Sequence, residues 1–294
     1  RWLSEPENHR LVESVMERIR SGGPVRSSDF ERDGPKRGSW WDWKPAKRAL
    51  EHLYNRGDLM VANRVNFQRV YDLAERVLPP WVDVDEPTEA EAFRYLLDRS
   101  MRALGICDPR QVPEYMALKR TEARPYVEQL VQDGTFVPVN ARLASGEVKE
   151  LVIHRENLPR LEQAADGGLV PRHVTFLSPF DNLFWAKGRD VQFWGFEQIL
   201  EAYKPRPTRR WGYFCMPILH GDRLVGRIDP KLERGTGTLR LINIYLESDV
   251  PEHEEFVASL AGAFRDFMVF HHAHDLVVER SEPAGIGQRL LAAL

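Results

Sequence analysis

The chain has 294 residues, 43% of them hydrophobic and 29% charged, and a formal net charge of -3. This composition is typical of a globular protein with two or three domains. No apolar run approaches the roughly 18 residues of a membrane span, and no basic start precedes an apolar stretch, so we expect neither a membrane segment nor a secretory signal. The two cysteines, Cys107 and Cys215, indicate no disulfide framework or zinc site, and we expect a reducing, cytoplasmic location.

Charge is distributed unevenly along the chain. Residues 10–76 contain 14 Lys/Arg against 10 Asp/Glu, whereas residues 83–91 contain five acidic and no basic side chains. Such asymmetry is compatible with one surface that faces a polyanion. A solvated surface of alternating charge explains the same counts, and charge alone favours that simpler reading.

The N-terminal region begins with a predicted amphipathic helix. Apolar residues at helical spacing predict a helix that ends at Gly22, followed by a very short extended piece at residues 24–25. A one- to two-turn helix is expected at residues 29–31, with Ser27 or Ser28 as its N-cap.

A third helix is expected from about Pro45 to Gly57, since proline is tolerated in a first turn. Its basic face carries Lys44, Lys47 and Arg48 together with Glu51. Two strands at residues 59–64 and 68–73, around a tight turn, predict a hairpin. Three helices followed by a hairpin is the order of a winged helix, whose third helix would enter a DNA groove while the hairpin lies along the backbone.

The same order recurs further along the chain. Helices are expected at residues 88–104, 109–116 and 122–134, followed by strands at residues 135–140 and 149–154. The third helix of this second unit has an acidic rather than a basic face, with Glu122, Glu128 and Asp133. We therefore predict two units of one plan, of which the first is better suited to bind DNA.

The C-terminal region predicts short strands and a last helix. The strands are expected at residues 173–177, 211–219, 223–229 and 238–246, and the helix at 251–271. The tail after Glu279 is expected to be loosely ordered. The predicted fold class is α+β, with tandem winged-helix units at residues 1–82 and 83–170 and an antiparallel β-barrel-like domain with a C-terminal helix at 171–294.

Five segments carry distinctive motifs. They are residues 23–30, 40–45 (Trp-Trp-Asp-Trp-Lys-Pro), 66–73, 177–181 (Leu-Ser-Pro-Phe-Asp) and 219–229, which ends in Val-Gly-Arg-Ile-Asp. Together they resemble the YcaQ/AlkZ-like winged-helix DNA glycosylases, and the similarity extends over residues 2–271. The resemblance implies tandem winged helices and a β-barrel curved around DNA. It also implies hydrolysis of the N-glycosidic bond of alkylated purines, and in some members the unhooking of interstrand crosslinks.

The catalytic signature of that family is Gln-Φ-Asp or Gln-Φ-Gln, with Φ an apolar residue. N7-alkylation makes the base a cationic leaving group, so a carboxylate or amide need only position water and stabilise an oxocarbenium-like sugar. None of the eight glutamines in this chain begins such a motif. We expect the family's first winged helix, with the motif, to lie before Arg1, so that the chain is the DNA-binding portion of a glycosylase. A naturally shortened homologue without the activity is the alternative, and whether the chain itself is an enzyme stays open.

The candidate DNA contacts are cationic and aromatic side chains on the basic helix, the hairpin and a basic loop. They are Trp41, Trp43, Lys44, Lys47, Arg48, Arg64, Arg69, Arg209 and Arg210. They would contact the phosphates of double-stranded DNA that is alkylated or crosslinked. With DNA as the partner, we expect the cytoplasmic protein to be nucleoid-associated. A solvated surface, an ion pair of Arg64 or Arg69 with Asp72 or other acids, and packing of the tryptophans are the competing interpretations.

Two aspartates and a histidine trio receive structural interpretations. Asp181 and Asp229 could be catalytic carboxylates, but a buried Asp that caps a turn or pairs with Arg227 is the commoner arrangement. Three histidines lie near the end of the last predicted helix: His271, His272 and His274. No Cys or carboxylate is spaced so that it could complete a metal site with them. We expect no metal and no cofactor.

Three classes of function remain open at this point. The first is a monomeric DNA glycosylase. The second is a winged-helix DNA-binding protein without chemistry, such as a regulator, which would usually dimerise to meet two half-sites. The third is a scaffold whose hairpins bind protein, which DNA binding that weakens steeply with salt would exclude.

Overall fold

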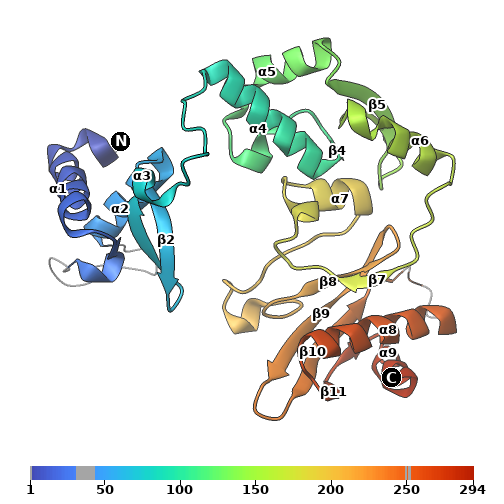
Figure 1. Cartoon of the computed structure of the whole chain (residues 1–294). Helices are drawn as coiled ribbons and strands as arrows, with labels where there is room; N and C mark the ends of the chain where they lie inside the picture. Colours follow the sequence, from blue (N-terminus) through green and yellow to red (C-terminus); the bar gives the residue numbers. More distant parts are fainter. Residues whose placement is uncertain (1, 31–43, 249, 251–252) are drawn as a thin grey trace. The chain divides into compact units, whose positions relative to one another are not determined.

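The computed structural model describes residues 2–30, 44–248, 250 and 253–294. The chain forms two compact units, Arg1–Glu86 and Pro87–Leu294, called here the N-terminal and the C-terminal unit (Figure 1). The mix of helices and strands confirms the α+β class. Trp41 and Trp43, two of the predicted DNA contacts, lie outside the described residues.

The N-terminal unit packs two helices against a small sheet. Its elements are η1 (Trp2–Ser4), α1 (Pro6–Gly22), β1 (Val25–Arg26), η2 (Ser27–Asp29), α2 (Pro45–Arg56), β2 (Leu59–Val65), β3 (Gln68–Leu73) and α3 (Ala74–Val77). The sheet order is β1-β3-β2. Val15, Ile19 and Leu50 are fully buried between the helices and the sheet. As predicted, α2 ends at Gly57, whose φ of +89° suits glycine.

The expected serine cap of the short helix is wrong. Neither Ser27 nor Ser28 caps η2, which begins two residues earlier than the sequence suggested. Instead, the carboxylate of Asp29 accepts the backbone N–H of Arg26 at 2.8 Å and its guanidinium at 3.0 Å. A carboxylate forms stronger, charge-assisted hydrogen bonds than a serine hydroxyl. Asp29, the last residue of η2, therefore closes the turn by binding back to the residue that precedes η2.

The first part of the C-terminal unit repeats the sheet order of the N-terminal unit. Its elements are α4 (Glu89–Leu104), β4 (Ile106–Cys107), η3 (Pro113–Met116), α5 (Arg120–Gln132), β5 (Phe136–Arg142), β6 (Val148–His154), η4 (Arg155–Asn157) and α6 (Leu158–Ala165). The sheet order is β4-β6-β5. In both sheets, therefore, a short first strand pairs with the second strand of a hairpin. The helices and hairpin expected for the second unit are present, except that the helix expected at residues 109–116 is reduced to the 3-10 turn η3.

The second part of this unit is a curled half-barrel sheet covered by a helix. The remaining elements are β7 (Val174–Phe176), η5 (Asn182–Phe184), α7 (Arg189–Trp194), η6 (Arg206–Thr208), β8 (Met216–His220), β9 (Arg223–Glu233), β10 (Thr238–Leu246), α8 (Glu254–Phe270), β11 (Asp275–Val278), β12 (Ser281–Glu282) and α9 (Ile286–Ala293). The strand order is β11-β10-β9-β8-β7. Phe256, Leu260 and Phe264 of α8 are buried against the sheet, and α8 lies across it in Figure 1.

Two expectations for the C-terminus are wrong. The tail after Glu279 is ordered: β12 pairs with β10, and α9 buries Ile286 and Leu290 completely in the core formed with α8. The sheet is also not wholly antiparallel, because β11 and β12 run parallel to β10. The reason is the connection: α8 crosses over between β10 and β11, and a helical crossover returns the chain in the direction of the strand it left.

The described residues contain neither a metal-ligand cluster nor a membrane-spanning helix. Within them, no cluster of three or more His, Cys, Asp or Glu side chains could hold a metal ion. The described helices also include none with the length and apolar character needed to cross a membrane.

Both thiols are expected to be unreactive in the folded protein. Cys107 and Cys215 are free and buried, and burial raises the pKa of each thiol to about 12. Because the thiolate is the reactive species, labelling by a thiol reagent such as Ellman's reagent should be negligible until denaturant is added, when both thiols react. Rapid labelling of one thiol in native protein would contradict the burial of that residue.

Candidate nucleic-acid interface

The N-terminal end of α2 gathers three of the predicted contacts. Lys44 is the N-cap residue, and Lys47 and Arg48 lie in the first turn. The ammonium of Lys44 donates to the carbonyl of Phe30 at 3.1 Å, and the guanidinium of Arg48 lies over the ring of Trp2 at 4.9 Å. These contacts hold two of the cations at a helix end that already favours anions through its unpaired N–H groups.

The hairpin β2–β3 presents the next two predicted contacts. Residues 62–68 are all exposed, and Arg64 and Arg69 face each other in the register. Arg69 is partly neutralised, since Glu51 of α2 accepts from it at 2.9 Å. The acid that pairs with Arg69 is thus on the neighbouring helix, whereas Asp72 pairs with Arg76 at 3.2 Å. Within residues 2–30 and 44–86, no carboxylate forms an ion pair with Arg64.

A buried glutamate fixes the basic loop of the C-terminal unit, residues 201–214. Glu201 is 1% exposed. It accepts the backbone N–H groups of Trp211 at 2.8 Å and Arg210 at 3.1 Å, and the ammonium of Lys204 at 3.0 Å. Burial raises the pKa of the Glu201 carboxyl, but the hydrogen bonds from Trp211, Arg210, Lys204 and Gly212 outweigh it and hold that pKa at about 2. The carboxylate therefore stays ionised and anchors the loop.

Arg209 and Arg210 project from this anchored loop. The Nε of Arg209 donates to the carbonyls of Lys204 at 3.0 Å and Glu201 at 3.2 Å. Its guanidinium lies 4.9 Å from the ring of Tyr213, and that of Arg210 lies 4.4 Å from the ring of Trp211. Both predicted arginines are thus held in a rigid setting, which lowers the entropy lost on binding an anion.

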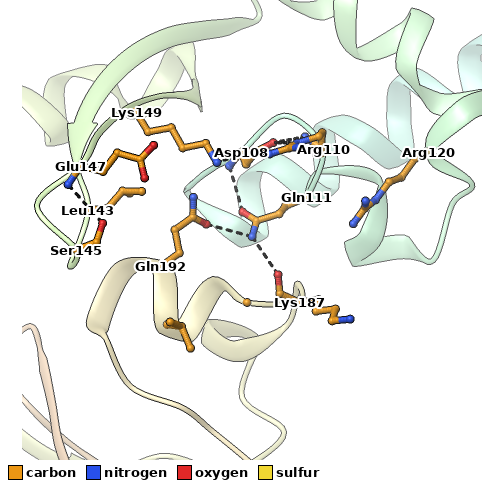
Figure 2. A pocket seen from close by; sticks show the side chains of 12 residues that line it. Asp108, Arg110, Gln111, Arg120, Leu143, Ser145, Glu147, Lys149, Lys187 and Gln192 are labelled. Atoms are coloured by element: carbon orange, nitrogen blue, oxygen red, sulfur yellow. Dashed lines mark hydrogen bonds and ion pairs between the residues drawn. The ribbon is translucent and has the colours of Figure 1, made fainter.

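A polar pocket of about 500 Å³ was not anticipated from the sequence. Figure 2 shows Gln111 at its centre: the amide accepts the backbone N–H of Asp108 at 3.1 Å and donates to Gln192 at 3.2 Å. Four cationic side chains line it: Arg110, Arg120, Lys149 and Lys187. They come from four separate segments, so no local sequence pattern could have revealed the pocket.

Asp108 in this pocket is a counter-ion rather than a candidate base. It is 5% exposed, and it accepts from Arg110 and Lys149, each at 2.8 Å. The Arg110 guanidinium, together with the Lys149 ammonium and against the effect of burial, holds the pKa of Asp108 well below its usual range. Its oxygens are occupied by cations, so it has little capacity to take up a proton.

Comparison with protein-family models shows to which family the chain belongs. The family model for AlkZ-like DNA glycosylases matches residues 2–270. The chain belongs to the AlkZ-like DNA glycosylase family. Membership of this family indicates that the general function is that of a DNA-repair glycosylase, which is a hydrolase, and that the partner is DNA. We found no solved structure that matches the chain.

Two of the motifs that carry the resemblance have structural roles here. Asp181 accepts the N–H of Leu183 at 2.9 Å and caps η5. In the Val-Gly-Arg-Ile-Asp segment, a side chain at Gly226 would overlap the carbonyl oxygen of Tyr245 on β10. Asp229 accepts the N–H groups of residues 213 and 214 at 2.9 and 3.2 Å. This segment therefore holds the basic loop against the half-barrel.

The interpretation that Asp229 pairs with Arg227 is wrong. The Arg227 side chain is 3% exposed and its guanidinium pairs with Glu247 at 2.9 Å. It is also sandwiched between the rings of Trp211 at 3.9 Å and Phe196 at 4.1 Å. Asp229 is instead occupied by the loop N–H groups, which a carboxylate binds strongly because it accepts without donating.

Proposed function

We propose that the chain binds duplex DNA as the DNA-binding portion of a glycosylase. That glycosylase hydrolyses the N-glycosidic bond of alkylated purines, including crosslinked ones. The observation that carries the proposal is the grouping of Lys44, Lys47 and Arg48 at the start of α2, beside a hairpin that exposes Arg64 in the same unit. In this proposal α2 is a recognition helix and β2–β3 is a wing. Phosphate contacts by such cations set position and most of the affinity.

The C-terminal unit supplies a second contact in this proposal. Arg209 and Arg210 would bind phosphate from the anchored loop. Helix α5 would contribute little, because the cations at its start are neutralised locally: Lys119 pairs with Glu122 at 2.6 Å and Arg124 with Glu128 at 3.4 Å. We propose functional domains at residues 1–82, 83–170 and 171–294, acting together as a monomer.

The test is base excision and binding measured on the same duplexes. The chain should bind N7-methylguanine and crosslinked duplexes at nanomolar to micromolar concentration, with affinity that falls steeply with salt, and a protein that joins the chain to a Gln-Φ-Asp or Gln-Φ-Gln segment should also release the alkylated base. Binding without excision by that longer protein would contradict the catalytic part of the proposal. Absence of binding would overturn it altogether.

A DNA-binding role without chemistry is the second candidate. It is favoured by one observation: the chain contains no Gln-Φ-Asp or Gln-Φ-Gln segment. A dimer that prefers one sequence would support this candidate, because paired recognition helices read half-sites spaced by one helical turn. A monomer without sequence preference would count against it.

A further inference from the structure

The tip of the hairpin β2–β3 places a large aromatic side chain in solvent. Phe67 is 96% exposed, and the neighbouring residues 62–66 and 68 are exposed as well. The hairpin extends away from α1 and α2 in Figure 1. An isolated exposed aromatic has no stabilising role in the fold, because the free energy of burying it is not gained.

The turn geometry adds a second unfavourable feature at the same residue. Asn66 and Phe67 form the two-residue turn, with φ of +49° and +64°. Positive φ at both positions is the type I′ arrangement, which favours Asn followed by Gly. Asparagine suits its position, but a bulky phenylalanine in the left-handed region is uncommon and strained. The sequence thus keeps a phenylalanine where glycine would be more stable, which points to a function at this residue.

Near its tip, the hairpin carries only positive charge. Between Leu59 and Tyr71 the sequence has two arginines and no acidic residue. Arg64 lies directly opposite Arg69, a like-charge pair that is unfavourable in an isolated hairpin. The Nη1 of Arg64 donates to the carbonyl of Phe67 at 3.4 Å, so this guanidinium sits beside the turn. Glu51 of α2 partly neutralises Arg69, and a polyanion bound along both strands would neutralise Arg64 as well.

We propose that Phe67 is a wedge that inserts between stacked bases of duplex DNA while Arg64 and Arg69 contact the flanking phosphates. Apolar side chains used in this way unstack one base step and kink the duplex, with phosphate contacts supplied by neighbouring cations. Unstacking would make the glycosidic bond of a damaged nucleotide accessible. The inference rests on the proposed function, because it requires that the N-terminal unit binds duplex DNA.

The test uses the full chain and a duplex with 2-aminopurine at the damaged step, since this base brightens when it is unstacked. Wild-type protein should raise the fluorescence on binding. Phe67→Ala should reduce that rise to less than about half and weaken binding about tenfold, the range for loss of one base–aromatic stack. The dependence of affinity on salt should stay unchanged, because no phosphate contact is removed. Phe67→Leu, which keeps an apolar wedge, should retain most of the fluorescence rise.

Trp81→Ala is the matched control, because Trp81 is 83% exposed in the same unit but outside the hairpin. It should leave the fluorescence rise and the affinity unchanged. Tight binding by wild type without brightening, or equal brightening by Phe67→Ala, would overturn the wedge and leave the proposed function intact. No binding by wild type would overturn both. Reduced affinity for a protein partner with unaltered DNA binding would assign Phe67 to a protein contact and also overturn the wedge.

Discussion

Replacing Lys47, Arg48 and Arg64 together by alanine should lower the affinity for duplex DNA about a hundredfold near physiological salt. Each phosphate contact releases about one counterion, so the slope of log affinity against log salt should also become shallower by about 3. The loss should be similar for any duplex sequence, because contacts to phosphates carry no sequence information. Fluorescence anisotropy titrations at several salt concentrations measure both quantities.

A matched triple variant controls for the loss of charge. Arg10, Arg20 and Arg56 are exposed cations of the same unit that lie outside the start of α2 and the hairpin. Their joint replacement by alanine changes the net charge equally but should weaken binding only slightly, through the long-range field. Equal losses in the two triples would show that the DNA-binding surface has been assigned to the wrong face.

Glu201→Gln should destabilise the C-terminal unit by about 2–3 kcal/mol at neutral pH. The carboxylate is buried and accepts three backbone N–H groups as well as the ammonium of Lys204, and hydrogen bonds to a charged group contribute more than neutral ones. A glutamine at this position keeps one acceptor oxygen and places an N–H₂ donor against backbone donors. Urea denaturation monitored by fluorescence gives the free energy of unfolding.

The pH dependence of the same variant gives an independent check. The pKa of Glu201 is lowered from 4.5 to about 2, so its contribution is fully present above about pH 4.5 and is lost as the pH falls towards 2. The difference in stability between wild type and Glu201→Gln should therefore shrink over that window. Glu197→Gln, an exposed neighbour, should show little difference at any pH. A gap that stays constant between pH 4.5 and 2 would contradict the stabilising role of the ionised carboxylate.

The Glu201 prediction also bears on DNA binding. Loss of the anchor would free the loop that carries Arg209 and Arg210, so these arginines would lose more conformational entropy on binding phosphate. The structure thus connects a buried carboxylate, which has no contact with DNA in the proposal, to the geometry of an exposed basic patch.

The sequence by itself determined the local elements. Helical spacing of apolar residues together with Gly57 predicted α2 and its end, and alternating strands around a tight turn predicted the hairpin. These features depend on near neighbours and backbone preferences, which are present in a short window of sequence. The motif at residues 225–229 also carried the family resemblance, which the family match confirms.

Only the tertiary structure decided which side chains meet. It paired Arg69 with Glu51, 18 positions apart, assembled a polar pocket from four segments around Gln111, and ordered α9 by burying Ile286 against the half-barrel. These contacts depend on how separate elements pack, and a chain direction or a partner at long sequence separation has no local signature. Phe67 shows the same limit: its identity could be read from the sequence, but its exposure and positive φ at the hairpin tip required the folded backbone.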